Sequence, residues 1–350
     1  MWCPYAPIPP KATAAGQGGA GRQSGNGWQR RGDGVAMAWR WPILFGMSES
    51  LGYIGLGHLG THLASSLLRA GHRVTVTDLN RDLADGLIAA GATWADTAEL
   101  VAAQSDVVFT CLPSPGAINA VVTGPNGMLA GLRPGGTWID NSTNDRSETL
   151  RLAELCAAKG VSMLECPVTG GVHKAAEGDI TVLVGGDQDL FEQHRHLLAA
   201  LGDPILYMGP IGNAAVIKVI TNMLAFIHLV AAGEALMLAK RGGLDLTAAF
   251  EAIRNSSGNS FVHETESQVI LNGSYNIGFT MDLALKDLGF AMQFGRDFGV
   301  PLEVAGLVEQ TFIRATAQYG RSAWSSQVVK LLEDAVGTDL RAPGFPEVLQ

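Results

Sequence analysis

Short apolar runs and amphipathic segments alternate along the chain from Leu51 onward. Apolar or alternating runs predict six strands, at Leu51–Ile54, Arg73–Thr77, Asp106–Leu112, Thr137–Asp140, Met163–Cys166 and Ile180–Val184. Segments with helical spacing that end near a glycine predict helices at Thr61–Ala70, Arg81–Ala90 and Ser147–Lys159. This alternation is typical of a parallel sheet with helices on both faces.

The strand pattern stops after Gly212. Asn213–Arg241 has the pattern of one long helix, and further helices are expected at about residues 246–254, 262–271, 281–298, 303–318 and 323–335. The sequence therefore predicts an α/β domain over 47–210 and an all-α domain for substrate binding and dimerisation over 211–340, joined by the long helix. Because that helix carries Lys218, Asn222 and Glu234, we expect it to be buried in protein and not to span a membrane.

Residues 1–46 lack this periodicity and are expected to form a disordered leader. They carry five basic residues against the single acid Asp33, and they hold four of the seven tryptophans. The apolar core of a secretory signal is missing from them. An organelle transit peptide is one interpretation; we favour a plain tail before Met47 and a cytoplasmic protein.

Composition and charge narrow the function classes. Hydrophobic residues make up 47% of the chain and charged residues 16%, which is typical of a globular protein. The formal net charge of −9 argues against nucleic acid as the main partner. The four cysteines and eight histidines do not form spacings typical of metal ligands, so we expect no metal site.

A glycine-rich turn, Gly55-Leu56-Gly57-His58-Leu59-Gly60, follows the first predicted strand and opens a helix. In such a turn the first glycine permits the tight bend, the second lets the backbone approach a pyrophosphate, and the third lets the helix pack on the strand. The helix N-terminus then offers free N–H groups to the anion. The sequence therefore predicts a Rossmann-type dinucleotide-binding domain.

Asp78 ends the second predicted strand, 18 residues after Gly60. An acid there accepts a hydrogen bond from the ribose 2′-hydroxyl of NAD and repels the 2′-phosphate of NADP. Arg81 lies close enough in sequence to offset part of that repulsion. NAD is the expected cofactor, with NADP as the alternative.

Three further motifs follow the glycine-rich turn in this order: the loop from Glu165 to Gly171, the helix start from Gly212 to Asn222, and Lys286-Asp287-Leu288. On these four motifs the chain, from Leu51 to beyond Trp324, resembles the β-hydroxyacid dehydrogenase family, which includes 3-hydroxyisobutyrate dehydrogenase and the tartronate and succinic semialdehyde reductases. The loop from Glu165 to Gly171 departs from the usual family pattern. Glu165 and Cys166 replace the usual Asp and Ala, and Thr169 replaces Ser.

Lys218 is the residue that we expect to act as the acid and base. Hydride transfer to a carbonyl leaves charge on oxygen, so a cation that can donate a proton is a suitable partner. Burial among apolar helix residues should lower the pKa of this lysine toward neutrality. From the helix alone, a lysine that reaches solvent is the competing interpretation. Asn222 lies four residues on, so both side chains face one side of the helix.

The resemblance implies roles for several other positions. A carboxylate of the substrate is expected to bind at Thr169, Gly170 and Gly171, helped by Thr143, with Phe279 and Asp287 also at the substrate. Leu112, Pro113, Thr143 and Lys286 are expected at the cofactor, together with the glycine-rich turn. Read without the family, Thr169-Gly170-Gly171 is equally consistent with a plain turn, and Phe279 and Asp287 are more simply structural.

The expected function is therefore NAD(P)-dependent interconversion of a small β-hydroxy acid and its semialdehyde. A small carboxylate-bearing substrate is the expected partner, and the family implies a homodimer or homotetramer. Two alternatives stay open at this point. One is another enzyme of the superfamily, of the imine-reducing or phosphogluconate type, and the other is a nucleotide-binding scaffold without catalysis.

Overall fold

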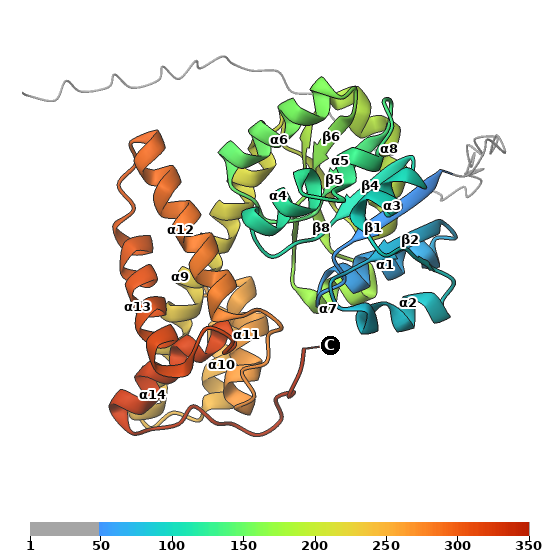
Figure 1. Ribbon diagram of the computed structural model, residues 1–350. Helices are drawn as coiled ribbons and strands as arrows, with labels where there is room; N and C mark the ends of the chain where they lie inside the picture. Colours follow the sequence, from blue (N-terminus) through green and yellow to red (C-terminus); the bar gives the residue numbers. More distant parts are fainter. Residues whose placement is uncertain (1–48, 350) are drawn as a thin grey trace, which may run out of the picture. The chain divides into compact units, whose positions relative to one another are not determined.

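The computed structural model describes residues 49–349, so the expected leader at 1–46 lies outside the described residues. Its first half alternates strands and helices (Figure 1). In chain order these are β1 (Ser50–Ile54), α1 (Gly60–Arg69), β2 (Arg73–Thr77), the 3₁₀ helix η1 (Arg81–Ala84), α2 (Asp85–Ala89), β3 (Thr93–Trp94), α3 (Ala98–Ala103), β4 (Val107–Thr110), α4 (Pro115–Thr123), α5 (Met128–Gly131), β5 (Thr137–Asp140), α6 (Arg146–Ala158), β6 (Ser162–Glu165), β7 (Val168–Thr169), α7 (Val172–Glu177), β8 (Thr181–Gly186), α8 (Gln188–Leu201) and β9 (Ile205–Tyr207).

The strands form one sheet in the order β3-β2-β1-β4-β5-β6-β8-β7, with β9 paired to β8. Every pair from β3 to β6 is parallel, and the first six strands have the order of a doubly wound dinucleotide-binding fold. β8 is antiparallel to both β6 and β7. The expectation of a purely parallel sheet was therefore wrong at this edge, because β7 leads through the short helix α7 into a strand that runs back.

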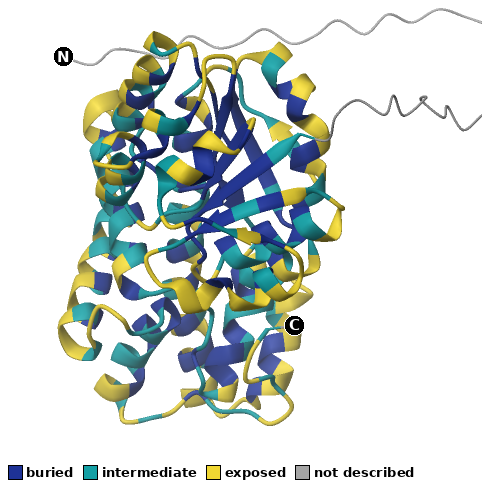
Figure 2. Ribbon diagram, turned by 45° about the vertical axis from the view of Figure 1, so that its right-hand side comes forward, coloured by how far each residue is buried: buried dark blue, intermediate teal, exposed yellow. Residues whose placement is uncertain are grey.

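Helices cover both faces of this sheet. The core on one face contains Leu63 and Leu67 of α1 and Phe191 of α8, and the core on the other contains Ile118 of α4 and Leu152 of α6. Strand residues are buried on both sides, which gives the dark interior seen in Figure 2. Parallel strands buried on both faces are nearly continuous apolar runs, which is why their sequence pattern was easy to detect.

The second half is helical apart from one isolated bridge between Thr280 and Trp324, within the described residues. Its elements are α9 (Asn213–Arg241), α10 (Leu246–Arg254), α11 (Phe261–Asn272), α12 (Met281–Phe298), α13 (Glu303–Tyr319), the 3₁₀ helix η2 (Ser325–Val329) and α14 (Lys330–Val336). The helix expected at 323–335 is thus two shorter elements. The predicted all-α character of this half and the long helix α9 are confirmed.

Helix α9 has 29 residues and contributes Phe226, Leu229 and Leu236 to the core of the helical half. By length and composition it is the one helix among residues 49–349 that is able to cross a membrane, which alone is weak evidence. Nine of its residues are buried against the rest of the protein, including Lys218. Its N-terminal turns pack against β7 and β8, so the helix connects the sheet to the helical half.

Candidate active site

The glycine-rich turn has the geometry that each of its glycines was expected to provide. A Cβ on Gly55 would lie 2.4 Å from the carbonyl oxygen of Cys111, and one on Gly60 would lie 2.0 Å from the oxygen of Gly55. Both positions therefore exclude a side chain. A Cβ on Gly57 would meet nothing within 4 Å, so this glycine borders open space. The open side lies at the N-terminus of α1, and helix N-termini that follow a glycine-rich turn are typical binding sites for phosphate groups.

Asp78 lies at the end of β2 beside this turn. Its Oδ2 accepts a hydrogen bond from Leu56 N at 2.6 Å, and its Oδ1 accepts one from Asn80 N at 2.9 Å. Arg81 lies 5.4 Å from the ring centre of Trp94 and pairs with Asp85 at 3.7 Å. The carboxylate is thus held at the turn, while the guanidinium group is engaged by other partners.

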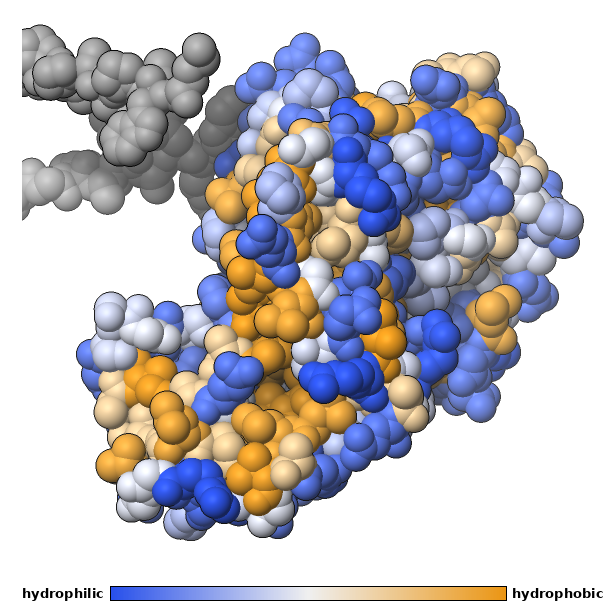
Figure 3. All heavy atoms as spheres, turned by 90° about the vertical axis from the view of Figure 1, so that its left-hand side faces the viewer, coloured by the Kyte–Doolittle hydropathy of each residue, from blue (hydrophilic) through white to orange (hydrophobic). Residues whose placement is uncertain are grey.

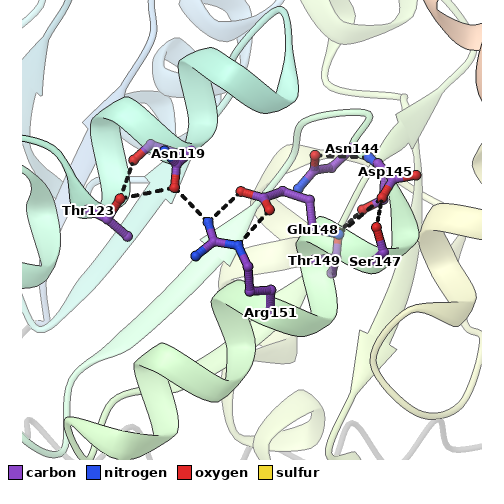
Figure 4. A network of polar contacts seen from close by, with 8 residues as sticks. All are labelled: Asn119, Thr123, Asn144, Asp145, Ser147, Glu148, Thr149 and Arg151. Atoms are coloured by element: carbon purple, nitrogen blue, oxygen red, sulfur yellow. Dashed lines mark hydrogen bonds and ion pairs between the residues drawn. The ribbon is translucent and has the colours of Figure 1, made fainter.

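A network of polar contacts between α4 and the start of α6 supports the segment that carries Thr143 (Figure 4). Asp145 caps α6 by accepting a hydrogen bond from Glu148 N at 3.1 Å. Arg151 binds Glu148 through two nitrogens, each at 2.7 Å, and donates to Asn119 of α4 at 2.6 Å. These contacts fix the start of α6 just after Thr143, the residue that is predicted to contact both the cofactor and the substrate.

A second set of hydrogen bonds joins buried polar side chains at the ends of β4 and β5. Asp140 accepts hydrogen bonds from the hydroxyl of Thr110 at 2.7 Å and from Ser142 N at 3.0 Å. The Ser142 hydroxyl accepts one from Leu112 N at 2.9 Å, and a Leu112 methyl carbon would lie 3.0 Å from a Cβ on Gly55. The structure thereby brings Leu112 next to the glycine-rich turn, whereas Pro113 is exposed.

Lys218 is buried, with 8% of its surface exposed, and it does not reach solvent as the competing interpretation required. Its Nζ donates to Asn222 Oδ1 at 2.8 Å, and Asn222 Nδ2 donates to Asp287 Oδ2 at 2.6 Å. Burial lowers the pKa of Lys218 to about 8; Asp287 opposes this shift and Lys286 adds to it. A lysine with this pKa is able to exchange protons near neutral pH.

Lys286 connects the helical half to the sheet. Its Nζ lies 2.9 Å from Asp287 Oδ1 and donates to the carbonyl oxygen of Thr143 at 3.0 Å. Asp287 is 1% exposed. The Lys286-Asp287 motif therefore joins the lysine helix on one side and the Thr143 segment on the other.

The segment Thr169-Gly170-Gly171 begins at the last residue of β7, and both glycines have positive φ, of 129° and 92°. A Cβ on Gly278 would lie 3.2 Å from a methyl carbon of Val172, so the loop's end lies beside the residue that precedes Phe279. Phe279 is half-buried, with its ring 6.1 Å from that of Phe226. The end of the loop therefore lies beside the segment that leads into α12.

Sequence patterns carried no signal for Trp324, which lies at the start of η2. Its ring makes an edge contact with His58 of the glycine-rich turn, with centroids 6.2 Å apart. Leu59, the next residue of the turn, packs on the sheet core. Trp324 pairs with Thr280 in the bridge, and the adjacent Ser325 N donates to Phe279 O at 2.8 Å. The contact therefore links the cofactor turn to the segment that begins α12.

The described residues hold no group of three or more histidine, cysteine or acidic side chains arranged for a metal ion. Two histidines of α8, His194 and His196, lie beside one carboxylate. His196 Nε2 lies 3.2 Å and His194 Nδ1 lies 3.9 Å from the two oxygens of Glu49.

Two family models match the chain. Residues 50–209 match the NAD binding domain of 6-phosphogluconate dehydrogenase, and residues 212–332 match the NAD-binding domain of NADP-dependent 3-hydroxyisobutyrate dehydrogenase. The two matches together span most of the described chain.

Several named relatives match the chain over nearly their whole length. The chain is 34% identical over 295 residues to 2-(hydroxymethyl)glutarate dehydrogenase of Eubacterium barkeri, covering 84% of this chain and 98% of the relative. It is 32% identical to 2-hydroxy-3-oxopropionate reductase of Escherichia coli, covering 81% and 97%. A solved structure of 3-hydroxyisobutyrate dehydrogenase from Mycobacterium tuberculosis, with L-serine, has a TM-score of 0.74 at 28% identity, covering 82% and 99%.

The fold, the glycine-rich turn and the named relatives together define the class of this protein. It is a nicotinamide-dinucleotide-dependent oxidoreductase that acts on CH–OH groups. The chain belongs to the β-hydroxyacid dehydrogenase family. Imine reductases share the fold at 22% identity or less, and relatives that align over most of their length are named for hydroxy acids, so the alternatives are not favoured.

Proposed function

We propose that this enzyme reduces a short carboxylate-bearing semialdehyde, or oxidises the corresponding β-hydroxy acid, with Lys218 as the general acid and base. The observation that supports this most is the chain of hydrogen bonds from the buried Lys218 through the half-buried Asn222 to the buried Asp287. A lysine held in this way, without a carboxylate in direct contact, retains its proton for the substrate oxygen.

The cofactor, when bound, accepts or supplies the hydride. In reduction, the Lys218 ammonium group donates a proton to the oxygen that gains charge, and in oxidation the neutral amine removes it. Asn222 accepts one hydrogen bond from Lys218 and donates another to Asp287, which fixes its amide orientation. This leaves the remaining Lys218 protons free for the substrate.

NAD is the cofactor that we propose, with NADP as the alternative. Gly55, Gly57, His58, Leu59 and Gly60 would hold the pyrophosphate at the start of α1. Asp78 supports NAD, because a carboxylate already fixed beside the turn would repel a 2′-phosphate. Arg81 is occupied by Trp94 and Asp85, which leaves little to offset that repulsion. The remaining cofactor contacts that we propose are Leu112, Pro113, Thr143 and Lys286.

The substrate carboxylate would bind to the loop Thr169-Gly170-Gly171. Both glycines have positive φ, and successive backbone N–H groups in turns of this kind form concave sites for anions. Thr143, Phe279 and Asp287 would border the rest of the substrate. The named relatives act on short acids that carry hydroxyl groups, which supports a substrate of the same class.

We further propose a cytoplasmic enzyme with a cofactor domain over 47–210 and a helical domain over 211–340 that pairs with a second copy. Figure 3 shows hydrophobic residues gathered on one face of the molecule. The exposed apolar side chains of the helical half include Leu224 of α9 at 44%, Leu307 of α13 at 70% and Phe298 of α12 at 53%. A contiguous exposed apolar patch is typical of a protein–protein interface. Sedimentation of wild type and of the Leu307→Glu variant tests this pairing. Wild type that sediments as a monomer, as the variant does, would refute the pairing.

The experiment for the function compares a short semialdehyde acid, its methyl ester and an uncharged aldehyde of equal length, each with NADH and NADPH. Loss of a charge-assisted hydrogen bond costs about 1.5–3 kcal/mol, so kcat/KM should fall by roughly one to two powers of ten for the ester. Equal rates for acid and ester would refute carboxylate recognition at the Thr169 loop. Binding of NADH without turnover of any compound would support the scaffold instead.

A further inference from the structure

Helix α9 begins on a carboxylate from another part of the fold. Glu165, at the end of β6, accepts hydrogen bonds from Gly212 N at 2.5 Å, Ala214 N at 2.9 Å and Ala215 N at 3.1 Å. Glu165 is 3% exposed. Gly212, which precedes the helix, has no side chain that could cap it, and the first turn of α9 holds no acidic residue. A helix N-terminus leaves N–H groups unsatisfied, and here one distant carboxylate binds three of them.

The fold provides a specific space for this side chain. Gly185 of β8 lies opposite Glu165 in the antiparallel pair. A Cβ on Gly185 would lie 2.2 Å from Glu165 Oε1 and 2.9 Å from its Cδ. Glutamate at this position therefore requires glycine across the strand pair.

The backbone N–H groups that Glu165 binds lie close to the proposed catalytic lysine, at the start of the same helix. Lys218 lies six positions after Gly212, which is about 9 Å along the axis of an α-helix. Because a rigid helix carries its N-terminal placement to the following turns, the Glu165 contacts fix where Lys218 stands relative to the sheet. An ångström of misplacement in such a group can cost about 100-fold in rate.

We propose that Glu165 is a positioning residue for Lys218, which fixes the start of α9 to the end of β6. This rests on the proposed function, since it is the acid and base that is being positioned. The role predicts that loss of the Glu165 charge impairs turnover and leaves binding of the dinucleotide intact, because the glycine-rich turn lies on other elements.

Ionisation of Glu165 provides an independent readout. Burial and, to a smaller extent, Asp140 of β5 raise its pKa to about 7, against the opposing effect of the three backbone hydrogen bonds. The other ionisable groups around this position are Cys166, directly after β6, and Arg146 of α6, whose Nε would lie 3.3 Å from a Cβ on Gly212. Because a protonated acid cannot accept three N–H bonds as well as a carboxylate does, reduction should slow below pH about 7.

The test uses the full chain with Glu165→Gln, Glu165→Asp, Gly185→Ala and the double variant Glu165→Asp/Gly185→Ala. We measure kcat, the dissociation constant of NADH, and hydrogen exchange of the Gly212, Ala214 and Ala215 amides. E165Q should lower kcat at least roughly tenfold, keep NADH affinity within about twofold, speed exchange of the three amides and abolish the acid limb of the pH profile. G185A should lower kcat as well, whereas adding G185A to E165D should cost little, because the shorter aspartate leaves room.

Several outcomes would overturn the proposal. These are unchanged amide exchange in E165Q, unchanged kcat despite faster exchange, or an equal loss of NADH affinity and kcat with the acid limb retained. A G185A effect of the same size in the wild-type and E165D backgrounds would also overturn it. Wild type that binds NADH but turns over no acid of the panel would refute the proposed function itself, and the positioning claim with it.

Discussion

The side-chain nitrogen of Asn222, on α9, donates to the carboxylate of Asp287, on α12, at 2.6 Å. This bond fixes the orientation of the amide, so that its oxygen accepts from Lys218. A neutral group thereby separates the lysine from the buried carboxylate. The arrangement holds the lysine by hydrogen bonding while its pKa stays near 8.

Replacing Lys218 with alanine should lower kcat for reduction by at least about 100-fold, because a general acid contributes that much or more. NADH binding, measured by fluorescence titration, should be retained. Lys240→Ala serves as the control, since this exposed lysine lies in the last turn of the same helix. Activity of K218A within about tenfold of wild type would be incompatible with a general acid at this position.

At alkaline pH the rates of reduction and of oxidation should change with pH in opposite directions. Reduction needs the protonated amine, so its rate should fall as pH rises through about 8, the pKa of Lys218. Oxidation needs the neutral amine, so its rate should rise over the same range. Profiles of kcat/KM in both directions provide the measurement, and two profiles that change in the same direction there would contradict the assignment.

Asp78→Ala should reduce the preference for NAD over NADP, and wild type should prefer NAD. The carboxylate beside the turn is the group that repels a 2′-phosphate. The values of kcat/KM for both cofactors decide this, with Asp82→Ala as a neighbouring exposed-acid control. A wild type that already prefers NADP would show that this interpretation of Asp78 is wrong.

Trp324→Ala should weaken NADH binding by about two- to tenfold, since an aromatic contact contributes roughly 0.5–1.5 kcal/mol. Its ring contacts His58 at the cofactor turn, so its loss should act on the dissociation constant more than on kcat. Trp324→Phe should restore most of the affinity, and Phe298→Ala, at an exposed aromatic, should leave it unchanged. Unchanged affinity in W324A would remove Trp324 from the cofactor site.

Glu266→Gln should stabilise the protein at alkaline pH. Burial raises the pKa of Glu266 from 4.5 to about 8, and its Oε2 has no hydrogen-bond partner among the described residues. Stability from the neutral acid is fully present below pH about 4.5 and is lost as pH rises through about 8. Melting temperatures of E266Q should therefore exceed those of wild type above pH 8, whereas the exposed Glu154→Gln control should follow wild type. Parallel curves for wild type and E266Q would refute this.

Much of the fold was predictable because its strands are buried on both faces and its helices end at glycines. The short elements α3, α5 and β9 were missed because they have too few residues for a period to appear, and the longer helices α4 and α8 were missed as well. Strand β8 runs antiparallel although its apolar run resembles the others. The Lys218–Asn222 pair followed from helical spacing. The partners of Glu165 did not, because three backbone N–H groups 47 to 50 residues away leave no pattern in side-chain types.

The most direct test of the central claim is isotope transfer. Wild-type enzyme is incubated with a short semialdehyde acid and NADH that carries deuterium on the transferable position of the nicotinamide ring, and the product is analysed by mass spectrometry. We predict a hydroxy acid with one deuterium on the carbinol carbon for each NADH consumed, and almost no labelled product with K218A. Bound NADH that persists without labelled product, across the whole panel of short acids, would contradict it.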